Sequence, residues 1–299
     1  MKPLTHLTLA VLMLAACATS ALAKEREPAR LRVLFIGNSL TYANDLPAMV
    51  EAVAGGSARV ACKSVAYPEF GLEEHWRHGE ALREIRRGGW THVVLQQGPS
   101  SLPESRRILV QFARRFAPEI RKTGAAIVMY GVWPGADRIA YLDAVTESYE
   151  QAAEEVGGAI VAVGDGWKAA WAIDPTLPLY APDAFHPSRL GSYLGALMFA
   201  EQITGTRPAM PISAMHGASL AQLRTAHTAA ASTLRARAVK TRADQSSRGM
   251  RFFVSALLMP PRAESLTHHA SQFHRTSYTA SPRTIRARLT CRLVARSRT

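Results

Sequence analysis

Short apolar runs alternate regularly with longer amphipathic ones along this chain. Apolar runs of strand length with no polar face are typical of strands buried on both sides in a parallel sheet. The longer runs between them have the spacing of helices, so the pattern predicts an α/β domain with helices on both faces of its sheet. The five expected strands cover residues 31–36, 59–66, 92–97, 125–132 and 159–163.

The helical segments complete a β-α-β-α order over residues 30–239. Pro47 suits the first turn of one helix, and Gly157 follows the end of another. We therefore expect a three-layer α/β/α domain with a five-stranded parallel sheet. The expected helices cover residues 46–53, 73–87, 103–122, 139–155, 187–203 and 219–239.

Ligands of such sheets bind beyond the carboxyl ends of the strands, so the residues that follow the strands are the first candidates for function. Ser39 follows Gly37 at the end of the first strand, where it can be a nucleophile or a simple helix cap. Asp183 precedes His186 by three residues, so its carboxylate can orient the imidazole or form a surface ion pair. Together these residues form a candidate Ser–His–Asp triad.

With these blocks the chain resembles the SGNH, or GDSL-like, hydrolase superfamily. That family carries its nucleophile in a Gly-Asp-Ser-like block after the first strand and an Asp-x-x-His block before the last helix. The blocks here are GNSL from Gly37 and DAFH from Asp183, and the resemblance covers about residues 31–205. It implies a flavodoxin-like sandwich and ester hydrolysis, with Ser39 as nucleophile, His186 as general base and Asp183 as its orienting partner.

The resemblance also implies an oxyanion hole built from the backbone N–H groups of Ser39 and Gly71 and from one side-chain amide. Gly71 can instead be a plain turn glycine. The family's third block, Gly-x-Asn-Asp, is replaced here by LQQGPSS, which lacks the asparagine. We expect Gln97 to supply the third donor, with Gln96 and Ser100 as alternatives.

The N-terminus has the pattern of an export signal. Lys2 precedes an apolar run, 4–16, that is too short to span a bilayer. Cleavage after the sequence ALA at 21–23 predicts a signal peptide of residues 1–23. The sequence LAAC, ending at Cys17, resembles a bacterial lipobox and predicts a lipid-modified cysteine instead. Export to the periplasm, the envelope or the medium is expected in either case.

The basic charge is concentrated in the last part of the chain. Residues 235–299 hold 14 Lys and Arg against two acids, whereas the formal net charge of the whole chain is +13. High charge and weak periodicity predict a disordered basic tail over 240–299. The tail is either an electrostatic tether to an anionic envelope or to nucleic acid, or a dispensable extension. We expect the extension, and therefore no nucleic-acid partner.

Other residues have both a functional and a structural interpretation. Trp133 can line the substrate pocket or pack in the core, and Asp165 can be a second acid or a turn residue with a capping role. His75 and His78 share one helix face, which predicts a solvated face rather than a metal site. Cys62 is expected to be a small buried apolar residue. Three cysteines are too few for a disulfide scaffold or a CxxC zinc site, so we expect neither metal nor cofactor.

The sequence as a whole predicts an exported serine esterase or acyl hydrolase. It would act through an acyl-enzyme on an ester such as an O-acetylated carbohydrate or a lipid. The alternative is a catalytically silent, envelope-anchored binding protein on the same fold. Apart from the substrate, the only expected membrane contact is an N-terminal lipid anchor.

Overall fold

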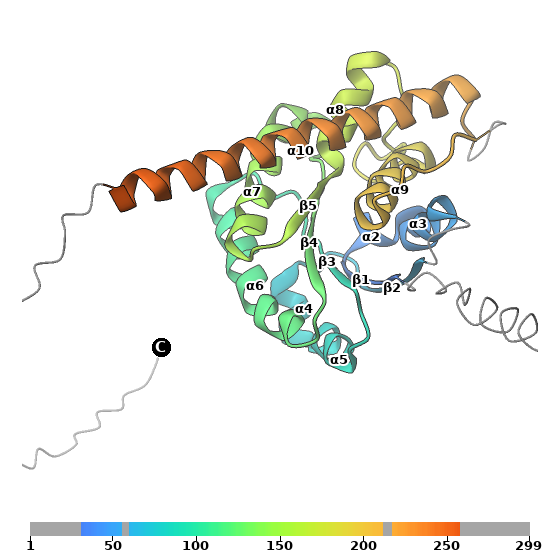
Figure 1. Ribbon diagram of the computed structural model, residues 1–299. Coiled ribbons are helices and arrows are strands. Elements are labelled where there is room, and N and C mark those ends of the chain that lie inside the picture. Colours follow the sequence, from blue (N-terminus) through green and yellow to red (C-terminus); the bar gives the residue numbers. More distant parts are fainter. Residues whose placement is uncertain (1–30, 56–59, 212–216, 258–299) are drawn as a thin grey trace, which may run out of the picture. The chain divides into compact units, whose positions relative to one another are not determined.

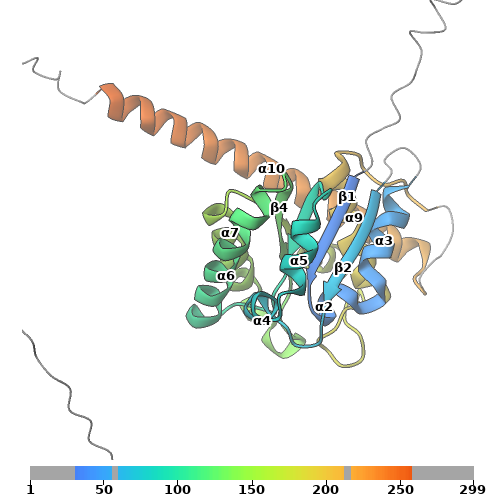
Figure 2. The same cartoon turned by 90° about the horizontal axis from the view of Figure 1, so that it is seen from below.

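The computed structural model of the protein describes residues 31–55, 60–211 and 217–257 (Figure 1). Its centre is one open sheet of five parallel strands in the order β2-β1-β3-β4-β5. Figure 2 shows β1 and β2 side by side, and Gly37 of β1 lies opposite Ala66 of β2. The predicted five-stranded parallel sheet is confirmed. The strands are β1 (Leu31–Gly37), β2 (Val60–Ala66), β3 (His92–Leu95), β4 (Ala126–Gly131) and β5 (Ala159–Ala162).

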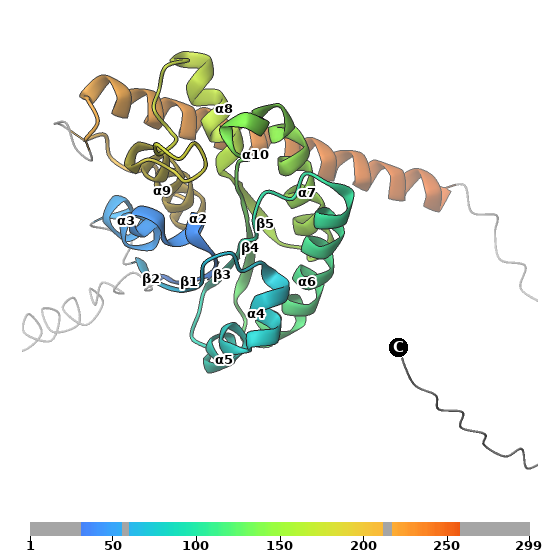
Figure 3. The same cartoon turned by 180° about the vertical axis from the view of Figure 1, so that it is seen from behind.

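Helices cover both faces of the sheet, as the sequence predicted. α3 (Leu46–Ala54) and α9 (Arg189–Thr204) pack together on one face, and the helices from α4 to α7 cover the other (Figures 1 and 3). The aromatic rings of Phe35 and Tyr130 each meet Phe199 edge-on, which joins the sheet to α9. The other helices are α2 (Ser39–Tyr42), α4 (Leu72–His78), α5 (Glu80–Arg87), α6 (Pro103–Arg121), α7 (Leu142–Glu155), α8 (Val163–Ile173) and α10 (Leu220–Leu257), with 3-10 turns η1 (Ala43–Asp45) and η2 (Ala136–Tyr141).

Two of the expected helices have other bounds in the structure. The helix expected over 73–87 is split into α4 and α5 at Gly79, whose φ of 79° is left-handed. The helix expected from Pro187 begins two residues later, because Pro187 pairs with Tyr180 in a β-bridge and Ser188 caps α9. The second difference leaves Pro187 and Ser188 in the loop that directly follows His186.

The expected last helix, 219–239, is also longer. α10 runs to Leu257, so its last part overlaps the basic segment 240–299, whose predicted disorder stays a prediction. Its sequence is rich in Ala and Arg, two good helix formers, and it lacks proline. The remainder of that segment lies outside the described residues.

The chain divides into two compact units, Met1–Arg248 and Gly249–Thr299. The sheet and every candidate active-site residue belong to the first unit. The expected signal peptide 1–23, with Cys17, lies outside the described residues. Within the described part of the chain, no helix combines the length and apolar character needed to cross a membrane.

Candidate active site

Ser39 stands at the first position of α2, directly beyond the end of β1. Asn38, and not Ser39, caps this helix, because Asn38 Oδ1 accepts a hydrogen bond from Leu40 N at 3.1 Å. The alternative interpretation of Ser39 as a helix cap is therefore wrong. The Ser39 hydroxyl is left to contact His186.

His186 bridges the other two residues of the predicted triad. Its Nε2 lies 2.9 Å from Ser39 Oγ, and its Nδ1 lies 2.6 Å from Asp183 Oδ2. An ionised carboxylate only accepts hydrogen bonds, so Nδ1 carries a hydrogen and, in the neutral ring, Nε2 accepts from the serine hydroxyl. This arrangement can remove a proton from Ser39 as its oxygen attacks a carbonyl carbon.

The Asp183 carboxylate is stabilised in its charged form by its own turn. Asp183 Oδ1 accepts from the backbone N–H groups of Phe185 and His186 at 3.0 and 2.9 Å. These hydrogen bonds, Phe185 N–H first and then the His186 ring, lower the pKa of Asp183 to about 2. The carboxylate is therefore ionised throughout the neutral range, as an orienting partner of imidazole must be.

The turn that carries Asp183 and His186 is held by two loops. The Trp133 indole N–H donates to the Phe185 carbonyl at 3.1 Å. From the other side, Asn44 Nδ2 donates to the Pro187 carbonyl and to Ser192 Oγ, both at 2.9 Å. Trp133 has no exposed surface, so the packing interpretation of this residue is correct. Sequence reasoning missed Asn44, although an Asn-Asp pair after a short helix is a recognisable turn signal.

Of the two backbone N–H groups expected in the oxyanion hole, one is free and one is engaged. No acceptor for Ser39 N–H occurs among the residues that the structure describes, and this N–H lies in the first turn of α2, on the same residue as the candidate hydroxyl. Gly71 N–H, at the start of α4, donates to Glu74 Oε2 at 2.9 Å. Glu74 is exposed, so its carboxylate can leave this N–H without disturbing the core.

The three candidates for the third donor are all hydrogen-bonded within the protein. Gln97 Nε2 donates to Ser100 Oγ at 3.0 Å and to Ser105 O at 3.3 Å. Gln96 Nε2 donates to Asn38 Oδ1 and to the Gln97 carbonyl. The structure thus shows no unengaged side-chain amide here, and the assignment of Gln97 stays a prediction that requires one of its bonds to open.

Gln96 instead holds the turn that carries Ser39. Its Oε1 accepts from Asn38 N at 2.8 Å and from Thr41 Oγ1 at 2.7 Å, and its side chain is fully buried. Gln97 lies beside Gly71, since its Oε1 accepts weakly from Leu72 N at 3.4 Å. The two glutamines therefore connect the ends of β1 and β3 with the start of α4.

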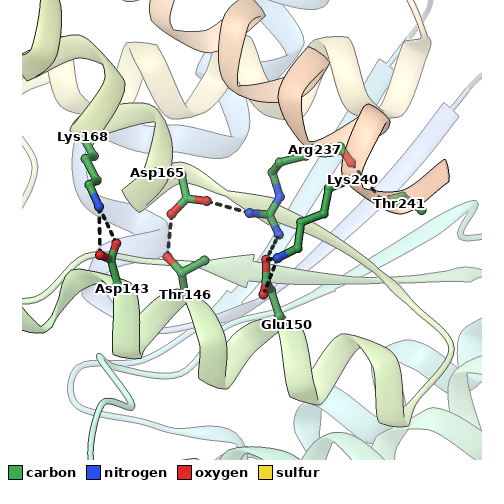
Figure 4. Close-up of polar contacts among 8 residues, drawn as sticks. All are labelled: Asp143, Thr146, Glu150, Asp165, Lys168, Arg237, Lys240 and Thr241. Carbon is green, nitrogen blue, oxygen red and sulfur yellow. Dashed lines mark hydrogen bonds and ion pairs between the residues drawn. The ribbon is translucent and has the colours of Figure 1, made fainter. Parts of the chain in front are cut away.

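Two further residues singled out in the sequence lie in structural roles. Asp165, in the first turn of α8, accepts from Thr146 and from Arg237 of α10 at 2.7 and 2.6 Å, which anchors α10 (Figure 4). Cys62 is half-buried, and burial, aided by the charges of Glu51 and Asp45, raises the pKa of its thiol to about 12. Such a thiol is not a nucleophile near neutral pH.

The two histidines of α4 do not share a solvated face. His75 is fully buried, whereas His78 is exposed. Leu72, an apolar residue three positions before His75, lies on the same face of the helix, which is a signal that the sequence already contained. Within the described ranges no three His, Cys, Asp or Glu side chains gather as metal ligands would.

Comparison with solved structures confirms the family resemblance. A protein of Slackia heliotrinireducens described as "a putative SGNH hydrolase" matches with 28% identity and a TM-score of 0.50, over 57% of this chain and 98% of its own. A DUF4886 family protein of Bacteroides uniformis matches with 17% identity and a TM-score of 0.56, over 69% of this chain and 95% of its own. No protein-family model matches this chain, and no curated relative matches it.

Proposed function

We propose that this chain, which has the fold of the SGNH hydrolases, is an exported serine esterase. The observation that carries the proposal is the continuous hydrogen-bonded series Asp183–His186–Ser39 at the carboxyl ends of the strands. Nucleophile, base and orienting acid are the three components that acyl transfer needs, and their order of contact is the productive one. The likeness to the Slackia protein, described as "a putative SGNH hydrolase", supports the hydrolase part of this proposal.

The reaction would proceed through an acyl-enzyme. Ser39 Oγ attacks the ester carbonyl while His186 Nε2 takes its proton, and Ser39 N–H donates to the resulting oxyanion. Collapse of this intermediate breaks the ester C–O bond, and His186 gives its proton to the leaving alcohol. Water, activated by the same imidazole, then releases the acid and restores Ser39.

Gly71 N–H is the second oxyanion donor in this proposal. This N–H would become available when the exposed Glu74 carboxylate moves away from it. Gln97, which lies next to Gly71, would donate its side-chain amide to the oxyanion after its hydrogen bond to Ser100 or Ser105 opens. The substrate would be an ester such as an O-acetylated carbohydrate or a lipid.

A silent binding protein on the same fold is the second candidate. It is favoured by one observation, namely that Gly71 N–H and the Gln97 amide are both engaged by the protein's own groups. A site whose donors never become free would bind an ester without turning it over.

The decisive experiment is labelling of the purified protein with a fluorophosphonate probe, which reacts with activated serines. We expect label in the wild type and none in Ser39→Ala. Ser101→Ala is the matched control, because it removes a hydroxyl from the loop after β3, and it should label normally. Absence of label on folded wild-type protein would favour the silent binding protein.

Export is proposed from the sequence of the N-terminus. Mass measurement of the mature protein distinguishes the two cleavage sites. A diacylglyceryl group on Cys17 indicates an envelope lipoprotein, whereas an unmodified chain beginning at Lys24 indicates ordinary signal cleavage. An uncleaved chain recovered from the cytoplasm would refute export.

A further inference from the structure

His75 of α4 contacts the backbone that precedes the nucleophile. Its Nε2 lies 2.7 Å from the carbonyl oxygen of Gly37, and its side chain has no exposed surface. A carbonyl oxygen only accepts, so Nε2 carries the hydrogen. Nδ1 has no hydrogen-bond partner within the described structure, so a second proton there would create a buried, unsatisfied charge. The site therefore holds the neutral Nε2–H tautomer.

The peptide group between Gly37 and Asn38 is held at both of its polar atoms. Its oxygen accepts from His75 Nε2 and from Tyr67 N, and its N–H donates to Gln96 Oε1 at 2.8 Å. This peptide is one residue before the Ser39 N–H. Because the orientation of one peptide plane limits that of the next, holding it restricts the direction in which Ser39 N–H points.

The same histidine belongs to α4, the helix that Gly71 caps. His75 N–H donates to the Gly71 carbonyl at 3.2 Å, which forms the first turn of α4. A second hydrogen bond joins the same two segments, because Asn38 Nδ2 donates to the Phe70 carbonyl at 3.0 Å. The Phe70 ring meets the imidazole edge-on, with centroids 5.2 Å apart. His75 thus connects the two segments that carry the proposed oxyanion donors.

We propose that His75 is a positioning residue for the oxyanion hole, which fixes the N–H groups of Ser39 and Gly71 relative to each other through its bond to the Gly37 carbonyl. This inference rests on the proposed esterase function. An oxyanion hole accelerates a reaction only when its N–H donors are in place before negative charge develops on the substrate oxygen. Displacing such a group by about 1 Å can lower the rate by about 10²-fold. A connection between the two donor segments therefore acts on the transition state more than on substrate binding.

The test compares two substitutions of His75 in the full chain. His75→Leu removes the N–H, whereas His75→Gln retains an amide N–H at about the reach of Nε2. With p-nitrophenyl acetate as substrate, we expect His75→Leu to lower kcat by about 10²-fold with KM changed less than about twofold. His75→Gln should recover most of that loss, because it can donate to the same carbonyl.

His227→Leu is the matched control. His227 is also buried and makes one side-chain hydrogen bond, at 2.7 Å to Tyr193 Oη, but it lies on α10. It should lose stability without a comparable fall in kcat. Wild-type kcat in folded His75→Leu, or a rise in KM alone, would overturn the inference.

Nuclear magnetic resonance of histidine-labelled wild type provides a readout that needs no variant to fold. A slowly exchanging Nε2–H on His75 that shifts when the fluorophosphonate occupies Ser39 supports the inference, and an Nδ1–H tautomer overturns it. Different results would refute the two proposals. Wild type that neither labels nor turns over substrate refutes the esterase, and with it a positioning role, whereas normal turnover in His75→Leu refutes only the positioning role.

Discussion

The imidazole Nε2 of His186 lies 2.9 Å from the hydroxyl oxygen of Ser39, although 147 positions separate the two residues in the sequence. Each lies at the entrance to a helix, Ser39 at the first position of α2 and His186 three residues before α9. The parallel sheet places Ser39 at the edge where its strands end, and the loop before α9 brings His186 to it. The contact exists because of this topology.

The orienting carboxylate can be tested with Asp183→Asn. The asparagine oxygen can still accept from the N–H groups of Phe185 and His186, so the turn should persist. We expect kcat to fall between about 10²- and 10⁴-fold, because the amide no longer supports the imidazolium that forms during attack. Steady-state kinetics with p-nitrophenyl acetate would measure the effect, and circular dichroism would verify the fold. Full activity in the variant would remove Asp183 from the mechanism.

Glu74 should restrain the oxyanion hole. Its carboxylate accepts from Gly71 N–H at 2.9 Å, so it competes with the oxyanion for that donor and repels its charge. Glu74→Gln keeps an oxygen to cap α4 but removes the charge, and we expect kcat to rise several-fold.

The control for this prediction is Glu73→Gln. Glu73 is the neighbouring acid and pairs with Arg77 rather than with the Gly71 N–H. It should leave kcat unchanged. A fall in kcat for Glu74→Gln would mean that Glu74 assists the reaction and that Gly71 is not an oxyanion donor.

The stability of the protein should decrease as the pH falls below about 6.5, in part because of His75. Burial lowers the pKa of His75 below its ordinary value of 6.5, and nearby His78 lowers this pKa further. The hydrogen bond to Gly37 and the charges of Glu74 and Glu80 raise the pKa, but by less than burial lowers it. The unfolded chain therefore binds this proton first as the pH falls, and the free energy of unfolding decreases by at most about 1.4 kcal/mol per pH unit for this group.

Urea unfolding at pH 7, 6 and 5 would measure this dependence. Burial also lowers the pKa values of His92 and His227, so some slope should remain in His75→Gln, but it should be smaller than in wild type. Asp183 acts in a different window, because its folded pKa of about 2 lies below its ordinary value of 3.8. Its contribution is lost only as the pH falls below about 4. An unchanged slope in His75→Gln would contradict the assignment of a buried neutral ring.

Arg237 should be the residue that fastens α10 to the domain. Its guanidinium contacts Asp165 at 2.6 Å and Glu150 at 2.8 Å, and its side chain is 17% exposed (Figure 4). We expect Arg237→Ala to lower the free energy of unfolding by about 2 kcal/mol, between the values for exposed and buried ion pairs. Lys240→Ala, which removes a 60% exposed partner of Glu150, should cost less than about 1 kcal/mol. Equal costs would mean that both pairs are surface contacts, and esterase activity should be retained in both variants.

Periodicity was sufficient to predict the layers and the strands of this fold. The strand expected over 31–36 is β1 with one residue added, because an apolar run of this length that stops at a glycine is typical of a strand buried in a sheet covered on both faces. Helix ends were less predictable. Gly79 divides a helical run whose charged and apolar residues keep the same spacing on both sides of it. α10 continues past Val239 because the residues that follow still favour a helix.

The candidate triad could be predicted from its residue types and its position after the strands, but the surrounding contacts could not. Asn38 caps α2 in place of Ser39, and the buried state of His75 depends on the carbonyl that faces it from another segment. A hydrogen bond between residues far apart in sequence has no periodic signal, because it depends on how two elements pack.

Apolar periodicity and chain order were enough to predict the fold class, the parallel sheet and a candidate Ser39–His186–Asp183 triad, because they act locally or through simple topology. Which donor groups are free depends on tertiary contacts. Ser39 N–H has no acceptor among the described residues, whereas Glu74 occupies Gly71 N–H and Ser100 and Ser105 occupy the Gln97 amide. Hydrogen bonding is directional and exclusive, so the state of each donor depends on atoms that only folding brings within 3 Å.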